Sequence, residues 1–244
     1  MKMLAFANRC LKELLRDRLT LIFGLGFPLV LLGLLTVIQH NIPVNLFELS
    51  TLTPGIAVFG LSFVSLFAGL LIAKDRSSSF MLRLFTAPMR ALDFLGGYTL
   101  PLLPLCVVQM LVCFAAAVLL GLKLRLSILF CILVLLPAAI LYISIGLLFG
   151  SLLNEKQVGS ISGALLTNLS AWLSGTWFSL DLVGGWFRKL AYALPFAHAV
   201  DAGRAALRMD LPALVPHLLW VTGYALFFLI LAVLVFRKKM YSDA

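Results

Sequence analysis

The stretch from Leu126 to Leu153, which reads LSILFCILVLLPAAILYISIGLLFGSLL, decides the fold class of this chain. Its 28 residues include no Lys, Arg, Asp or Glu, and about 20 consecutive apolar residues are enough for a helix to cross the hydrocarbon core of a bilayer. A strand of a membrane barrel would need only about 10 residues and would alternate apolar with polar side chains. The stretch therefore predicts a transmembrane helix, which Pro137 is expected to kink.

Five further stretches of the same kind lie before and after it. None carries a Lys, Arg, Asp or Glu in its interior, where each would cost roughly 2.5–3.5 kcal/mol. Pro101 and Pro104 predict a kink in the third of the six. We therefore expect an all-α integral membrane protein whose spans cover residues 19–38, 52–73, 94–122, 126–153, 158–180 and 214–236.

The composition of the whole chain agrees with this fold class. Of 244 residues, 62% are hydrophobic and 12% are charged, whereas a soluble domain has about half and about a quarter. A soluble globular domain is thereby excluded, and residues 1–244 are expected to form a single transmembrane domain. The net charge of +9 would indicate nucleic acid in a soluble protein, but here it reports orientation in the bilayer, and no nucleic-acid partner is expected.

The basic residues are unequally shared between the two sides of the membrane. If the spans alternate in direction, 13 of the 19 Lys and Arg residues lie on the side that holds both termini. Loops that are rich in Lys and Arg stay in the cytoplasm. We therefore expect a multi-pass protein of the plasma membrane, such as a bacterial inner membrane, with both termini cytoplasmic.

Residues 3–18 precede the first span and repeat apolar side chains with helical periodicity. One face carries Met3, Ala7, Leu11, Leu14 and Leu15. This pattern predicts an amphipathic helix on the inner membrane surface. The alternative is a short basic leader that only fixes the topology.

Motifs for chemistry within the chain are absent from the sequence. There is no GxxxxGK[ST] phosphate loop, no HExxH, no GxSxG and no pair of carboxylates at catalytic spacing. The cysteines at positions 10, 106, 113 and 131 lack the spacing of metal ligands. No catalytic residue, metal site or cofactor is therefore expected in this chain, and an intramembrane enzyme is the least favoured class.

A self-sufficient six-span carrier or channel is the alternative function. An ion-driven carrier normally needs an ionisable group at membrane depth. The nearest candidates, Asp93 and His217, lie near the ends of spans, and His217 is interpreted as an interfacial residue. This absence favours a subunit that is driven by a partner.

The fifth span carries small and hydroxyl residues at steps of three and four, which places them on one helical face. They are Ser160, Gly163, Thr167, Ser170 and Ser174. The face either lines a translocation path or lets another helix pack closely. Gly146, Gly150, Gly159 and Gly163 form two GxxxG patterns that agree with close packing, and the two roles can coexist at a subunit interface.

The inner loop after the second span is expected to hold a short cytoplasmic helix within residues 75–88. A serine run precedes it as a cap and Pro88 ends it, while Phe80 and Leu84 stand exposed between basic residues. This arrangement indicates a docking surface. The alternative is an ordinary positive-inside loop whose apolar side chains rest in the lipid interface.

The outer segment 181–213 is only moderately apolar, and Pro195 divides it into two helical pieces too short to span. A re-entrant hairpin that dips part-way into the membrane fits this pattern. Irregular backbone at that depth needs protein or water around it, so the hairpin is expected to cap a cavity.

Along nearly its whole length the chain resembles the type-2 permeases of ATP-binding cassette (ABC) exporters. Three groups of residues carry the resemblance: Asp75, Arg76, Phe80, Arg83, Leu84 and Pro88; then Ser174 and Gly175; and finally Pro195, Phe196, Val200, Asp201, Ala202 and Arg204. Where many members have Glu followed by Gly-Thr in the inner loop, this chain has Asp75 and three serines.

The resemblance implies that two permease subunits pair, as a homodimer or a heterodimer, on two copies of a separate cytoplasmic ATPase that binds ATP and Mg. It implies that segment 3–18 and the loop 75–88 both contact the ATPase. In the loop, the contacting residues would be Asp75, Arg76, Phe80, Arg83, Leu84 and Pro88. It places Ser160, Gly163, Thr167, Ser170 and Ser174 along the translocation path or the dimer seam, and Pro195, Asp201 and Arg204 in an extracellular gate.

Overall fold

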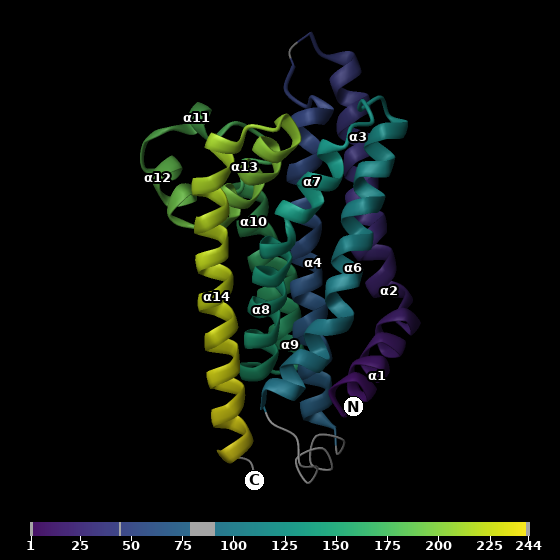
Figure 1. Cartoon of the computed structure of the whole chain (residues 1–244), viewed down its shortest axis with the longest axis vertical. Coiled ribbons are helices and arrows are strands. Elements are labelled where there is room, and N and C mark those ends of the chain that lie inside the picture. The colour runs from purple at the N-terminus through teal and green to yellow at the C-terminus, as the bar shows by residue number, and fades with distance from the viewer. Residues whose placement is uncertain (1, 44, 79–90, 243–244) are drawn as a thin grey trace.

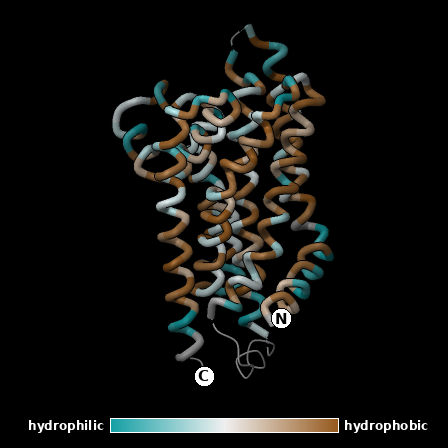
Figure 2. The backbone as a smooth tube through the Cα atoms, in the orientation of Figure 1, coloured by the Kyte–Doolittle hydropathy of each residue, from teal (hydrophilic) through white to brown (hydrophobic). Residues whose placement is uncertain are grey.

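The computed structural model describes residues 2–43, 45–78 and 91–242. Within these ranges all regular structure is helical and no strand occurs, as the sequence predicts. Figure 1 shows long helices running along one axis, with both termini at the same end of the bundle. Figure 2 shows hydrophobic residues along the lengths of these helices and hydrophilic ones gathered toward their ends.

The chain forms its helices in an order close to the expected one. At the N-terminal side these are α1 (Lys2–Arg16), α2 (Arg18–Leu21), the π-helix η1 (Ile22–Gly26), α3 (Phe27–Asn41) and α4 (Leu49–Ser77). After the undescribed segment come α6 (Ala91–Leu119), α7 (Ser127–Val134), α8 (Leu136–Leu152), α9 (Glu155–Ser160), the π-helix η2 (Ile161–Leu166) and α10 (Thr167–Leu173). The last four are α11 (Leu180–Val183), α12 (Gly185–Ala193), α13 (Pro195–Arg208) and α14 (Leu211–Ser242).

Five helices in the described part of the chain are long and apolar enough to cross a membrane. They are Ile22–Asn41, Leu49–Ser77, Asp93–Leu119, Ser127–Leu152 and Leu211–Lys239. These correspond to the expected first, second, third, fourth and sixth spans. The expected fifth span is not among them.

The fifth stretch differs from its predicted bounds of 158–180. It is helical from Glu155 to Leu173, because Asn154 and Gln157 form a capping box that starts the helix earlier. It ends seven residues early because Ser174 closes the last turn and Gly175 adopts a positive φ of 68°. Residues 174–179 are therefore irregular.

Proline has different effects in two of the spans. The expected kink at Pro137 is a break at Leu135 between α7 and α8, with the proline in the first turn of α8. Pro101 and Pro104 lie inside α6, which continues as one helix. The outer segment is divided at Pro195, as expected, but it contains three short helices rather than two.

Helix α4 lies at the centre of the bundle. Of the residues in its most apolar stretch, 83% are buried, compared with 22% in the first span and 17% in α14. The exposed apolar side chains of the two outer helices include Val30, Leu34, Leu219 and Phe227. Helices α3 and α14 therefore lie on the outside of the bundle.

Helix α8 packs against α4 with their backbones in close contact. A Cβ atom added at Gly146 would overlap the carbonyl oxygen of Ser65, and one at Gly150 would overlap the carbonyl oxygen of Gly69. Gly159, by contrast, has open space around it. Of the two GxxxG patterns, the first therefore sets the distance between α8 and α4.

The N-terminal helix ends at Arg16 rather than at residue 18 and presents two apolar faces. Phe6, Cys10 and Leu14 are buried against the bundle, where Phe6 packs edge-on against Tyr98 of α6. Leu11 and Leu15, which the sequence placed on the same face as Leu14, are exposed. The helix is thus docked on α6 by one face and leaves a second apolar face outside.

Candidate functional site at the end of α4

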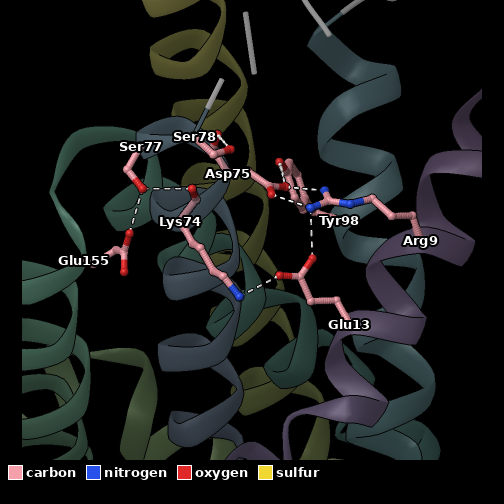
Figure 3. Close-up of polar contacts among 8 residues, drawn as sticks. All are labelled: Arg9, Glu13, Lys74, Asp75, Ser77, Ser78, Tyr98 and Glu155. Atoms are coloured by element: carbon pink, nitrogen blue, oxygen red, sulfur yellow. Dashed lines mark hydrogen bonds and ion pairs between the residues drawn. The ribbon is translucent and has the colours of Figure 1, made fainter. Parts of the chain in front are cut away.

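A buried carboxylate lies in the last turn of α4, near the end of the bundle that carries the termini. Asp75 is only 2% exposed. Both terminal nitrogens of Arg9 on α1 donate to its two oxygens at 2.6 Å, and the Tyr98 hydroxyl on α6 donates to Oδ2 at 2.8 Å (Figure 3). This two-pronged, charge-assisted geometry compensates for the burial of the carboxylate.

Glu13 extends this cluster along α1. Arg9 Nη2 also donates to Glu13 Oε2 at 2.9 Å, and Lys74 Nζ lies 3.0 Å from Glu13 Oε1 (Figure 3). The hydrogen bonds to Asp75 raise the pKa of Arg9 further above its usual range. Two acidic and two basic side chains therefore tie α1 to the end of α4.

The opposite side of the same turn is tied to α8 and α9. Arg76 Nη1 donates to the carbonyl oxygens of Gly150 and Ser151 at 2.9 and 2.6 Å. Carbonyls at the end of a helix lack partners within the helix, so Arg76 satisfies groups that α8 leaves open. The Ser77 hydroxyl donates to Glu155 Oε1 at 2.7 Å (Figure 3).

Four helices, α1, α6, α8 and α9, are thus fastened to the end of α4. Asp75 and Arg76 belong to the last turn of α4 and are both engaged within the protein, not in a separate loop helix. The remaining predicted docking residues, which are Phe80, Arg83, Leu84 and Pro88, lie outside the described residues.

The predicted polar face of the fifth helical stretch is divided between two environments. Thr167, Ser170 and Ser174 are buried, and the Ser170 hydroxyl bonds to Tyr142 of α8. Ser160 is exposed and Gly163 is half-buried. The three buried residues pack inside the protomer, while the two others lie toward its surface.

Asp201 and Arg204, two of the predicted outer-gate residues, are in contact at the far end of the bundle, and the third, Pro195, begins the same helix. Arg204 Nη2 donates to the carbonyl oxygen of Gly175 at 2.8 Å, and its Nε donates to that of Thr51 at 3.1 Å. Asp201 accepts from Arg204 at 3.3 Å and from Tyr192 at 2.8 Å. Burial, with the Asp201 charge as a second cause, raises the pKa of Tyr192 to about 12. Arg204 therefore fastens α13, which Pro195 begins, to α4 and to the turn after α10.

A pair of histidines joins α13 to α14 near this cluster, and no local pattern in the sequence predicts it. Nδ1 of His198 lies 2.7 Å from Nδ1 of His217, and Nε2 of His198 lies 2.9 Å from the carbonyl oxygen of Tyr192. A carbonyl can only accept, so Nε2 of His198 carries a proton. The Nδ1 contact then requires that one of the two facing nitrogens stays unprotonated.

Acid is expected to loosen this contact. Burial lowers the pKa of His198, and repulsion from His217 adds to this effect. The hydrogen bond to the Tyr192 carbonyl and the charge of Asp201 oppose it without reversing it. A base with a lowered pKa in the folded state stabilises the fold above its unfolded pKa of about 6.5 and loses that stabilisation as the pH falls. We expect a lower thermal midpoint at pH 5 than at pH 8 in detergent, and a smaller difference in His198→Gln. An equal difference in the variant would contradict this origin.

The described helices define a polytopic helical membrane protein with polar clusters at both ends of the bundle. No curated protein sequence matches the chain. The sequence model of the family described as ABC-2 type transporter matches residues 1–207, so the chain belongs to that family. It is accordingly the multi-pass membrane domain of an ABC transporter, a permease subunit, as its residues had indicated.

Proposed function

We propose that this chain forms the translocation path of an ABC exporter, paired with a second permease subunit and driven by two copies of a separate ATPase. In this arrangement the end of the bundle that carries the termini faces the cytoplasm. ATP and Mg are bound by the ATPase. The observation that carries the proposal is the anchored turn of α4, which in the sequence directly precedes the segment with Phe80 and Leu84.

Coupling follows from the connections of that turn. ATP binds the closed arrangement of two ATPases more tightly than the open one, and only such differential affinity can shift an equilibrium. Movement of the docked loop is passed through Asp75 to α1 and α6, and through Arg76 to α8. The whole end of the bundle therefore moves as one unit.

The path itself is proposed to run beside the first span and the stretch Glu155–Leu173, which then acts as a sixth span. Both contain a π-helical segment, at Ile22–Gly26 and at Ile161–Leu166. Such wide turns are rare and occur frequently at functional sites. Helices α11 to α13 close the outer end, where Arg204 holds the gate to α4.

The test is to replace Phe80 and Leu84 with Asp in a complex that contains the ATPase. Charged side chains in a docking interface remove contacts that cost about 2 kcal/mol or more to lose, so affinity should fall about 30-fold or more. Co-purification and cargo-stimulated ATP hydrolysis report the loss. The matched control replaces Leu182 and Val183 of α11, which are 75% and 55% exposed at the opposite end. Normal transport by the Phe80 and Leu84 variant would show that the docking assignment is wrong.

A further inference from the structure

A pocket of about 640 Å³ opens at the end of the bundle opposite the termini. Its lining comes from the end of α3, the start of α4, the turn that joins α6 to α7, and the end of α13. Figure 1 shows these elements at the end of the bundle opposite the termini. None of the residues predicted for docking, path or gate lines it. It is therefore distinct from the sites described above.

Three cationic side chains line this pocket. They are those of Lys123, Arg125 and Arg208, while Glu48 is the acidic residue among the described lining. Within the described chain none of the three cations takes part in a hydrogen bond or an ion pair. The pocket thus holds an excess of uncompensated positive charge that an anion would neutralise.

A buried hydroxyl in the pocket wall also lacks a partner. Ser127 lines the pocket and is 7% exposed, and its Oγ atom has no hydrogen-bond partner in the described part of the chain. Leaving such a buried group without a hydrogen bond destabilises the protein, and a ligand that accepts from it would remove that cost. Ser127 is also the first residue of α7, and the N-terminal end of a helix favours negative charge. Ser127 and the N-terminal end of α7 therefore form part of the wall of the pocket that the cations line.

The segment that supplies two of these cations also reaches outward with leucines. In the order Lys123, Leu124, Arg125, Leu126, the basic residues line the pocket, whereas the two leucines do not and are 79% and 82% exposed. Residues 122–125 are not helical, so neighbouring side chains are free to point to opposite sides. Exposed leucines next to basic residues are typical of a segment at a membrane interface.

We propose that this pocket binds the anionic phosphate headgroup of a phospholipid from the adjacent leaflet. Lys123, Arg125 and Arg208 neutralise the phosphate, and Ser127 donates to one of its oxygens. Leu124 and Leu126 lie in the surrounding acyl region. The bound lipid then fixes the turn between α6 and α7 against the end of α13, independently of how the permease is driven.

The experiment measures binding of phosphatidylglycerol and phosphatidylcholine to the full chain in detergent by native mass spectrometry. The wild type is expected to prefer phosphatidylglycerol. A basic residue near a membrane surface contributes about 1 kcal/mol to the attraction of anionic lipid, so Lys123→Gln with Arg125→Gln should weaken the binding of phosphatidylglycerol about 30-fold. The matched control is Arg188→Gln with Lys189→Gln, which removes two charges from α12 outside the pocket and should leave affinity unchanged.

A second variant separates ligand binding from folding. Because the Ser127 hydroxyl has no partner in the described chain, Ser127→Ala should leave the thermal midpoint unchanged or raise it. The same substitution should weaken the binding of phosphatidylglycerol several-fold. Equal affinity for the two lipids, or equal loss in the pocket and control variants, would overturn the proposal. Displacement of the lipid by an equal concentration of glycerol 1-phosphate would also overturn it, because the ligand would then be a soluble anion.

Discussion

Replacing Asp75 with Ala should lower the free energy of unfolding by about 3 kcal/mol. Removing one partner of a buried ion pair costs about 3–5 kcal/mol, and we take the lower end because the side chain of Arg9 is 35% exposed and can turn toward water. The Tyr98 hydroxyl, which is fully buried, loses its acceptor as well. Thermal unfolding in detergent measures the loss.

A double-mutant cycle shows whether this loss belongs to the pair. Arg9→Met and Asp75→Ala should be strongly non-additive, because each removes the same interaction. The control is Glu13→Gln, whose partly exposed ion pairs contribute about 1 kcal/mol or less. Additive effects of Arg9→Met and Asp75→Ala would mean that the contact contributes little, and the coupling route through α1 would then lose its basis.

Gly146→Ala should also destabilise the protein, by about 3 kcal/mol. A Cβ at this position would overlap the backbone of α4 at Ser65, and backbone cannot turn aside as a side chain can. Overpacking of a tight contact costs about 1–3 kcal/mol, occasionally more, and here α8 and α4 must separate. The thermal midpoint and the yield of folded protein report the effect.

Gly159→Ala is the matched control for this substitution. The position is helical and has open space, so Ala should be neutral or stabilise the helix by up to about 1 kcal/mol. Both glycines belong to GxxxG patterns, so their difference tests the packing rather than the motif. Equal tolerance at both positions would contradict the close approach of α8 to α4.

The helical membrane fold could be predicted because apolar length is a local property. Residues 126–153 predict a span from their own sequence, independently of the rest of the chain. The fifth stretch was harder, because its ends depend on the capping box at Asn154 and on the positive φ of Gly175. The first signal is visible in the sequence as Asn followed three residues later by Gln, and the prediction did not use it.

The site was less predictable because its partners are distant in the chain. The sequence predicts a docking role for Asp75 and Arg76, but nothing in their local sequence indicates that Asp75 pairs with Arg9 or that Arg76 binds the carbonyls at the end of α8. The docked face of α1 was also missed, since Phe6 and Cys10 were left out of its apolar pattern. Arg9 and Asp75 are 66 residues apart in the sequence, and a contact over that separation produces no periodic pattern.

The π-helical segment Ile161–Leu166 explains why the polar face of its helix divides. A π turn accommodates one residue more than an α turn, and one residue corresponds to about 100° of rotation. A stripe drawn at α-helical spacing is therefore out of phase on the two sides of this segment. The two ends of this helical stretch therefore direct their polar side chains to different sides. Ser170 points inward and bonds to Tyr142 of α8, whereas Ser160 is exposed on the surface of the chain.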